Sequence, residues 1–377
     1  MKRLGFSIYM EKVALATNLE YIERAAQHGF KRIFTCMMSV KGAKAEILAD
    51  LQAITKKAHE YEMEVFMDVG PTILKNYGIE IGRSILSLFT GKSDDLQFFI
   101  DAGLDGIRLD QSSTGMEEAF LTHNSHGLKI EINMSMDTHF LDLVMDFLPN
   151  KDRLYGCHNF YPRGYSGLDW EHFDKTTKAF DQRGLRKAAF ITSQESGAFG
   201  PWPADDRIPT LEIHRRLPID VQAKHLIAYG LIDDLMISNC FPSDAELKSL
   251  ASLDLETLTL DVNVASGIPD IAKAIMFKPT HIFRGDATSK SYFIRSMVRF
   301  IFREADLPPF NTVDIQRGDI IVDNNDYGQY KGELQIALKA MKNDGRTNVV
   351  GRIREEEIFI LDYIKPWQKF TLRPMML

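Results

Sequence analysis

Short apolar runs alternate with longer segments of helical periodicity along the first 240 residues. Segments such as 18–28 and 45–61 repeat apolar residues every three to four positions, which is typical of an amphipathic helix packed on a core. Glycine stands at several helix exits, just before the next apolar run, where a left-handed cap turns the chain. The pattern predicts eight strands: Leu4–Ile8, Arg32–Cys36, Glu64–Asp68, Gly106–Asp110, Lys129–Asn133, Leu154–His158, Ala188–Thr192 and Asp234–Ser238.

Eight strands that alternate with helices match the requirement of a closed parallel (β/α)₈ TIM barrel. A doubly wound α/β sheet would show the same alternation, so the barrel prediction rests on the count and on polar residues at several strand ends. We predict an α/β fold with this barrel over residues 1–245.

The pattern changes after the eighth strand. Ser243–Leu253 predicts a last helix, with Ser243 as N-cap and Glu246 completing a capping box. Residues 255–377 then predict a small, mostly antiparallel β-rich domain. Its expected strands are Thr257–Val264, His281–Arg284, Asp319–Asp323, Val349–Arg354 and Glu357–Ile364, and its expected helices are Ile268–Met276 and Ser291–Ile301.

Composition narrows the class of protein. Hydrophobic residues make up 45% and charged residues 26% of the 377, as in ordinary globular proteins. The net charge of −7 is spread without a basic run, so no nucleic-acid partner is expected. Cys36, Cys157 and Cys240 lack metal-ligand spacing and are interpreted as buried free thiols. We find no signal-peptide core and no long apolar run, so we expect a cytoplasmic protein with no membrane partner.

Polar residues stand at the expected carboxyl ends of most strands, where TIM barrels place their active sites. Carboxylates, amides and aromatic rings around one mouth suit a carbohydrate. We expect Asp110 and Glu195 to face each other as the catalytic pair, with carboxyl groups about 5–9.5 Å apart, and Asp68 to be the third catalytic candidate. The substrate-binding candidates from the strand ends are Glu131, Asn133, His158, Asn159, Tyr161 and Asn239.

Two loops add further candidates. The segment 196–218 after the seventh strand is rich in proline and charge and should overhang the site, so Arg207, His214 and Arg215 are expected to contact an anion such as a phosphate, and Glu212 is a further substrate-binding candidate. Arg163, after the sixth strand, is a further candidate. In the second domain, the loop 323–330 is expected to face the barrel mouth and contact a sugar through Asn324 and Tyr327.

Missing motifs argue against other chemistries. The chain has no nucleotide-binding glycine fingerprint and no lysine at a strand tip for a Schiff base, so no cofactor and no metal are expected. The alternative is a metal-dependent sugar-phosphate isomerase or epimerase. Its divalent ion would be bound by ligands among Asp68, Asp110, Glu131, His158 and Glu195. A peptide-binding or adhesion protein would leave the polar strand ends unexplained.

Five segments together resemble the bacterial 6-phospho-N-acetylmuramidase family, and the resemblance extends over essentially the whole chain. They are Leu4–Tyr9, Gly106–Asp110, His158–Pro162, Pro209–Arg215 and Tyr330–Ile336. The resemblance implies a TIM barrel followed by a cyclophilin-like domain, as the periodicity also suggests.

The resemblance also implies an activity. A member of this family would hydrolyse the β-1,4 bond of N-acetylmuramic acid 6-phosphate–N-acetylglucosamine, a disaccharide of peptidoglycan recycling. The expected partner is therefore this small phosphorylated disaccharide, and a homodimer is possible. The phosphate and lactyl carboxylate of the ligand would fit a mouth that carries arginines.

Overall fold

A computed structural model describes residues 1–37, 42–70, 96–203, 205–286 and 291–375. Its internal contacts divide the chain into two compact units. The first comprises Met1–Ala223 and Leu231–Ser252, and the second comprises Lys224–Gly230 and Leu253–Leu377.

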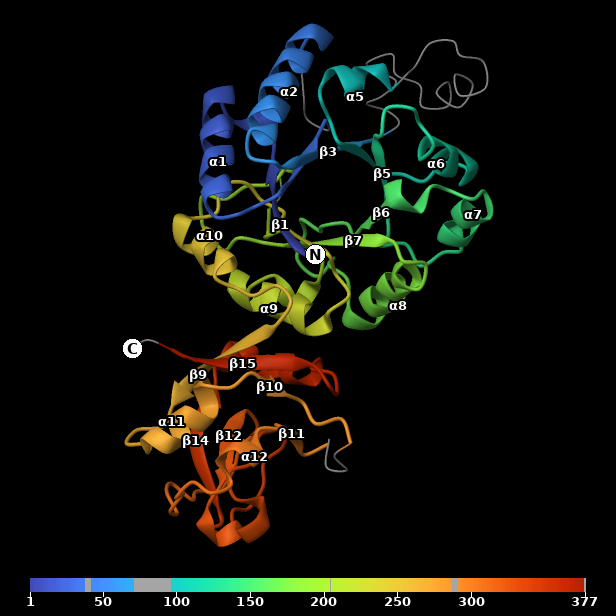
Figure 1. Cartoon of the computed structure of the whole chain (residues 1–377). Helices are drawn as coiled ribbons and strands as arrows, with labels where there is room; N and C mark the ends of the chain where they lie inside the picture. Colours follow the sequence, from blue (N-terminus) through green and yellow to red (C-terminus); the bar gives the residue numbers. More distant parts are fainter. Residues whose placement is uncertain (38–41, 71–95, 204, 287–290, 376–377) are drawn as a thin grey trace. The chain divides into compact units, whose positions relative to one another are not determined.

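The first unit contains a closed barrel in which eight parallel strands pair in sequence order and β8 pairs with β1 (Figure 1). The predicted TIM barrel is thereby confirmed, and the predicted strands agree with the observed ones to within two residues at each end. The strands are β1 Arg3–Ile8, β2 Arg32–Cys36, β3 Glu64–Val69, β4 Gly106–Leu109, β5 Lys129–Asn133, β6 Leu154–Cys157, β7 Arg186–Ile191 and β8 Asp234–Ile237.

Helices surround the barrel (Figure 1). Ser243 caps the last one as predicted, because its side chain accepts a hydrogen bond from the Glu246 backbone N–H. The Glu246 carboxylate does not complete a capping box but accepts hydrogen bonds from Ser193 Oγ (2.5 Å) and Gln194 N (2.8 Å) after β7. The α-helices are α1 Leu15–Gln27, α2 Lys44–His59, α5 Gln97–Asp101, α6 Met116–Leu121, α7 Phe140–Asp146, α8 Trp170–Asp181, α9 Ile219–Tyr229 and α10 Asp244–Ala251.

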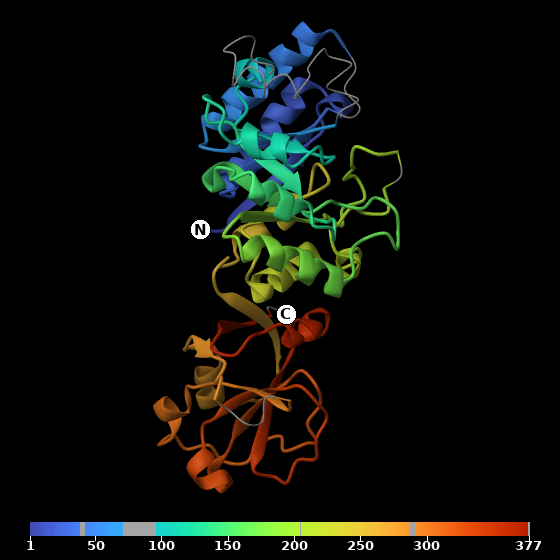
Figure 2. The ribbon, with the colours of Figure 1, turned by 90° about the vertical axis from the view of Figure 1, so that its right-hand side faces the viewer.

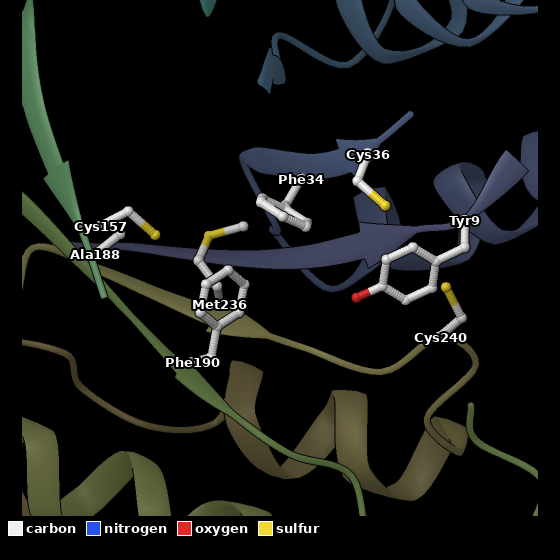
Figure 3. Packing of buried hydrophobic residues seen from close by; sticks show 8 residues of the cluster. All are labelled: Tyr9, Phe34, Cys36, Cys157, Ala188, Phe190, Met236 and Cys240. Atoms are coloured by element: carbon white, nitrogen blue, oxygen red, sulfur yellow. The ribbon is translucent and has the colours of Figure 1, made fainter. Parts of the chain in front are cut away.

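The interior of the barrel is a packed core. Figure 3 shows a buried cluster to which strands on opposite sides of the barrel contribute, including Phe34, Phe190 and Met236. The Phe34 and Phe190 rings meet edge to face with centroids 5.2 Å apart. All three cysteines are buried and free, as predicted.

Charged residues fill the amino-terminal end of the barrel. The Asp234 carboxylate at the start of β8 accepts hydrogen bonds from Arg3, Arg32 and Arg186. Burial alone would raise its pKa, but the three guanidinium groups overcome that effect and hold the pKa of Asp234 well below its ordinary value. The fully buried Arg32 also pairs with Glu131 and stacks on Phe66, with its guanidinium carbon 4.0 Å from the ring centroid.

The second unit is built on a seven-stranded sheet of order β10-β15-β9-β14-β12-β13-β11. Among the described strands of this unit only β15 and β9 pair in parallel, and a bridge between Phe283 and Ser296 links the two edges of the sheet. The predicted β-rich second fold is therefore a nearly closed mixed sheet. Its strands are β9 Leu258–Val264, β10 His281–Ile282, β11 Phe293–Arg295, β12 Asp319–Asp323, β13 Leu334–Ala337, β14 Thr347–Ile353 and β15 Lys369–Pro374, and its α-helices are α11 Asp270–Phe277 and α12 Arg299–Phe302.

Two predicted elements of the second unit are wrong. The expected strand Glu357–Ile364 lies largely in a 3₁₀ helix, η5 Glu355–Asp362. The sequence is ambiguous there, because the hydrophobic periodicity of a short apolar run does not distinguish a strand from a helix. The expected helix Ser291–Ile301 is split into β11 and α12. Strands β13 and β15 were not predicted as strands. None of the helices in the described part of the chain is long and apolar enough to cross a lipid bilayer.

Candidate active site

The carboxyl ends of β3, β4 and β6 bring a compact polar group together. Asp68 lies on β3, Asp110 follows β4 and Asn159 lies two residues beyond β6. Asp68 is the register partner of Arg108 on the neighbouring strand β4. The parallel barrel places all four residues at the same rim, where such folds carry their active sites.

The buried guanidinium of Arg108 holds this group together. Its Nη1 atom donates to Asp68 Oδ1 at 2.5 Å and to Asp110 Oδ1 at 3.3 Å, and its Nη2 atom donates to Asn159 Oδ1. Because one nitrogen contacts both carboxylates, their Oδ1 atoms can be no farther apart than the sum of those two distances. The arrangement therefore fixes two carboxylates side by side at the mouth of the barrel.

The two carboxylates differ in environment. The side chain of Asp68 is 8% exposed, whereas that of Asp110 is 34% exposed. Burial raises the pKa of Asp68 to about 6, with further upward contributions from Asp110 and Glu131 that Arg108 only partly offsets. Asp68 can therefore carry a proton at weakly acidic pH.

A cavity of about 400 Å³ opens above this group. This volume suits a small ligand. Its lining combines the four polar residues with Phe160, Tyr161, Pro162 and Trp202. Burial raises the pKa of Tyr161 above its ordinary value, so its hydroxyl stays protonated and can donate a hydrogen bond. Carboxylates, an amide and aromatic faces in one cavity are the recognition set of a sugar-binding site.

The loops after β6 and β7 lie against each other at this end of the barrel, as Figure 2 shows in green and yellow-green. Asp206 N donates to Pro162 O, and Tyr161 N donates to Pro209 O. Arg215 clamps the two loops, since its Nη1 atom donates to Tyr161 O (2.9 Å) and Arg207 O (2.6 Å).

Glu212 completes this clamp. Its carboxylate accepts hydrogen bonds from Nε (2.8 Å) and Nη2 (2.6 Å) of Arg215 and from the backbone N–H groups of Tyr165 and Gly167. The hydrogen bond from Arg215, supported by the two backbone donors, lowers the pKa of Glu212 to about 2. Glu212 and Arg215, both predicted to bind substrate, are thus engaged in holding the loops that line the cavity.

The remaining candidates for an anion site differ in exposure. His214 is fully buried. Arg207 is half-buried, adopts φ 71°, and donates from Nη2 to Gln194 O at 3.0 Å. Arg163 is exposed and directly follows Pro162, which lines the cavity.

His158 lies behind the cavity wall. Its ring is fully buried, stacks on Phe173, and contacts Ser135 Oγ through Nδ1 (3.1 Å) and Thr177 Oγ1 through Nε2 (2.9 Å). Burial lowers the pKa of His158 to about 3, so the ring is neutral. Ser135 Oγ also accepts from Asn159 N at 2.8 Å, so His158 supports the backbone of Asn159.

Other predicted site residues hold the barrel or its loops. Glu131 is buried in the ion pair with Arg32. Asn133 Oδ1 accepts from Ser135 N, and Asn239 exchanges two hydrogen bonds with the backbone of Ser193. The metal-ligand set of the alternative function is therefore not assembled, because Glu131 faces Arg32 and both ring nitrogens of His158 face hydroxyl groups.

Three further candidates are Glu195, in the loop after β7, and Asn324 and Tyr327, in the second unit. Glu195 is half-buried in the loop after β7, and its backbone N–H donates to Ser193 Oγ. Asn324 is fully buried and bonds to Gly345 O and Asn348 Oδ1. Tyr327 lines a separate pocket of the second unit.

Two residues that matter most in this geometry were not among the predicted site residues. Arg108 stands between Ile107 and Leu109 inside a strand, and a charged residue there could have signalled a partner within the barrel. Trp202 also lines the cavity, but the sequence pattern around it indicates only a stiff, proline-rich loop.

Comparisons with known proteins match both units. Profiles of two families, described as 6-phospho-N-acetylmuramidase, N-terminal and C-terminal, match residues 4–252 and 258–373. No match is found among curated proteins.

Two solved structures are similar over almost the whole chain. An uncharacterized B. cereus protein is 42% identical, with a TM-score of 0.88 and coverage of 99% of this chain and 100% of that one. A conserved Enterococcus faecalis protein of unknown function is 24% identical, with a TM-score of 0.69 and coverage of 99% and 96%, which supports the fold alone.

Proposed function

The chain belongs to the 6-phospho-N-acetylmuramidase family, a family of glycosidases, and from that premise we propose that it hydrolyses the β-1,4 bond of N-acetylmuramic acid 6-phosphate–N-acetylglucosamine in peptidoglycan recycling. The observation that carries the proposal is the pair of carboxylates, Asp68 and Asp110, which are held on one guanidinium nitrogen and line a cavity with aromatic walls.

Asp68 is the general acid of the proposed reaction. Glycosidases need a carboxylic acid whose raised pKa lets it protonate the departing glycosidic oxygen. Asp68 has that property because it is buried, and Arg108 fixes its position. After the bond breaks, the Asp68 carboxylate would take the proton from the water that completes hydrolysis.

Asp110 is the nucleophile. It is the more exposed of the two carboxylates, and it lines the cavity. In retaining glycosidases the two carboxyl groups lie about 5–5.5 Å apart, whereas inverting enzymes keep them about 6.5–9.5 Å apart to admit a water molecule. The shared contact with Arg108 supports the shorter separation and hence retention. It also favours Asp68 over Glu195 as the partner of Asp110.

Substrate recognition would involve the loop after β6. Asn159 and the Tyr161 hydroxyl can hydrogen-bond sugar hydroxyls, while Trp202 offers a face for the sugar ring. For the 6-phosphate we propose Arg163, which is exposed beside the cavity, with Arg207 as a second contact. Arg215 is engaged by Glu212 and by backbone carbonyls.

Mass spectrometry can test the proposed substrate. The protein would be incubated with the phosphorylated and the unphosphorylated muramyl disaccharide, and the release of N-acetylglucosamine would be followed. We expect cleavage of the phosphorylated form only. Asp68→Asn should slow it by about 10²–10⁴-fold, whereas Asp137→Asn, which breaks an exposed pair with Lys175, should leave it unchanged. Equal cleavage of both disaccharides would contradict the proposed phosphate specificity, and cleavage of neither would contradict the function.

A further inference from the structure

The second unit contains a cavity of its own, of about 330 Å³, on one face of its sheet. Side chains two residues apart on β12, namely Ile321 and Asp323, line it, and so do their neighbours on β13 and β14, Gln335 and Thr347. Residues that alternate along a strand point to the same face, so these side chains line the cavity from one face of the sheet.

The cavity has an apolar part and a polar part. Ile315 and Ile321 belong to a buried apolar cluster against which Phe293 and Met341 pack, and all four line the cavity. At the other end, Asp323 is 3% exposed and accepts hydrogen bonds from Thr347 Oγ1 (3.0 Å) and Gln335 Nε2 (3.1 Å). A ligand there must present an apolar group and a hydrogen-bond donor together.

The buried carboxylate of Asp323 forms no ion pair with any residue in the described part of the chain. Arg295, which also lines the cavity, is engaged by the Glu333 carboxylate instead. Burial, with a contribution from Glu333, raises the pKa of Asp323 to about 7. Each carboxylate oxygen can accept more than the one hydrogen bond it receives, so the group can accept a ligand N–H or O–H.

Two tyrosines stand at the rim of the cavity, on the 3₁₀ helix η4, Asn325–Tyr330. The Tyr327 and Tyr330 rings meet edge to face with centroids 5.6 Å apart. Arg346 lies over the Tyr327 ring at 4.4 Å, and Arg299 lies near the Tyr330 ring at 5.7 Å. Because a guanidinium group already lies over one face of each ring, the rim favours an uncharged ligand over a cationic one.

We propose that this cavity is a second binding site, specific for an N-acetylated monosaccharide such as N-acetylglucosamine. The acetamido N–H would donate to Asp323, the acetyl methyl group would contact Ile321 and Phe293, and the sugar ring would lie against Tyr327. The choice of an acetamido sugar rests on the proposed function, which releases one. Asn324 contributes indirectly, because its buried amide accepts from Asp326 N and fixes the start of η4.

Methyl NMR of the full chain with ¹³C-labelled methionine can test the site. Met341 reports on the second cavity, and Met236 in the barrel core serves as the internal reference. We expect N-acetylglucosamine to shift the Met341 signal saturably and glucose, which lacks the acetamido group, to leave it in place. An absent shift with N-acetylglucosamine, or an equal shift with glucose, would overturn the proposal.

Variants of the second unit test whether the Met341 shift arises from a ligand bound in this cavity. Asp323→Asn and Tyr327→Ala should each weaken the Met341 titration at least tenfold, whereas Asp270→Asn, at an exposed position of α11 paired with Lys273, should preserve it. Tyr327 is only half-buried, so its variant tests the site even if Asp323→Asn does not fold. An unweakened titration in folded Tyr327→Ala would also overturn the proposal.

The Met341 signal needs no turnover, so the two proposals can fail separately. A missing shift with intact disaccharide hydrolysis counts against the second cavity. Missing hydrolysis with an intact shift counts against the proposed function.

Discussion

A single arginine inside a barrel strand organises the candidate active site. Arg108 is buried and contacts Asp68, Asp110 and Asn159, so it sets the spacing of the carboxylates and the position of the amide. Without Arg108, two neighbouring carboxylates would repel each other, and the pKa of Asp68 would rise further. The chemistry proposed here therefore depends on one side chain that needs no contact with the substrate.

The pKa of Asp68 predicts a pH dependence. A general acid acts only when it is protonated, so kcat/KM should fall as pH rises above about 6, the raised pKa of this group. Asp68→Asn should lower kcat by about 10²–10⁴-fold and remove this limb of the profile. Measuring kcat/KM between pH 5 and 8 for both proteins checks the prediction. An unchanged limb in Asp68→Asn would assign the acid to another residue.

Arg163 should discriminate phosphorylated from unphosphorylated substrate. Removing a charge-assisted hydrogen bond costs about 1.5–3 kcal/mol, so Arg163→Gln should lower kcat/KM for the phosphorylated disaccharide by about tenfold to a hundredfold. Arg163→Lys should recover part of the loss, and Arg216→Gln on the adjacent loop is the matched control. An undiminished rate in Arg163→Gln would exclude this residue from the phosphate site.

At the scale of elements, the Glu212–Arg215 pair joins the loops after β6 and β7. Arg215→Met would break the contacts to Glu212, Tyr161 O and Arg207 O, so it should lower the free energy of unfolding by about 1–3 kcal/mol. Because the clamp positions the cavity wall, activity on any accepted substrate should fall by a common factor. Urea unfolding and kinetics with more than one substrate would measure the two effects.

The pH dependence of stability offers a check on the same clamp. The pKa of Glu212 is lowered from 4.5 to about 2, so its contribution is present above pH 4.5 and is lost as pH falls toward 2. Glu212→Gln should show a shallower loss of stability below pH 4.5 than the parent protein. Identical slopes would mean that the pair contributes nothing to folding.

Element by element, prediction from sequence was strongest where periodicity and covalent geometry act locally. The eight strands and the Ser243 cap follow from apolar runs and a short-range hydrogen bond. The failures involve non-local partners. Strand β15 forms by pairing in parallel with β9 across 112 residues, and η5 replaces the strand expected at Glu357–Ile364.

The same distinction explains the candidate site. Position at a strand end was enough to identify Asp68, Asp110, Asn159 and Tyr161 as lining residues. It could not show that Arg215 would turn toward backbone carbonyls, or that His158 would lie behind the wall between two hydroxyl groups. Those outcomes depend on side chains from other elements, which the pattern along the chain does not specify.

At the scale of the whole molecule, the charged residues that stabilise the barrel and those of the candidate active site lie at opposite ends of the barrel. Its amino-terminal end holds Asp234 among Arg3, Arg32 and Arg186, and its carboxyl-terminal end holds the candidate site. In the first cluster the Asp234 carboxylate is engaged by three guanidinium groups, whereas the second cluster opens onto a cavity. This division agrees with the general anatomy of TIM-barrel enzymes.

The amino-terminal cluster should therefore affect stability and not specificity. Asp234→Asn removes the buried carboxylate that three guanidinium groups share, including the fully buried Arg32, and should lower the free energy of unfolding by about 3–5 kcal/mol. The exposed-pair variant Asp137→Asn should change it by less than about 1 kcal/mol. Urea denaturation measures both, and a loss in Asp234→Asn no larger than in Asp137→Asn would contradict the structural role of the cluster.

The central claim is that Asp68 and Asp110, held together by Arg108, cleave the glycosidic bond with retention of configuration. Proton NMR of the anomeric signal during early turnover of the phosphorylated disaccharide tests it most directly. The account predicts that N-acetylmuramic acid 6-phosphate appears first as its β-anomer, before mutarotation. First release of the α-anomer would contradict it, because inversion needs a water molecule between carboxylates that this geometry holds too close together.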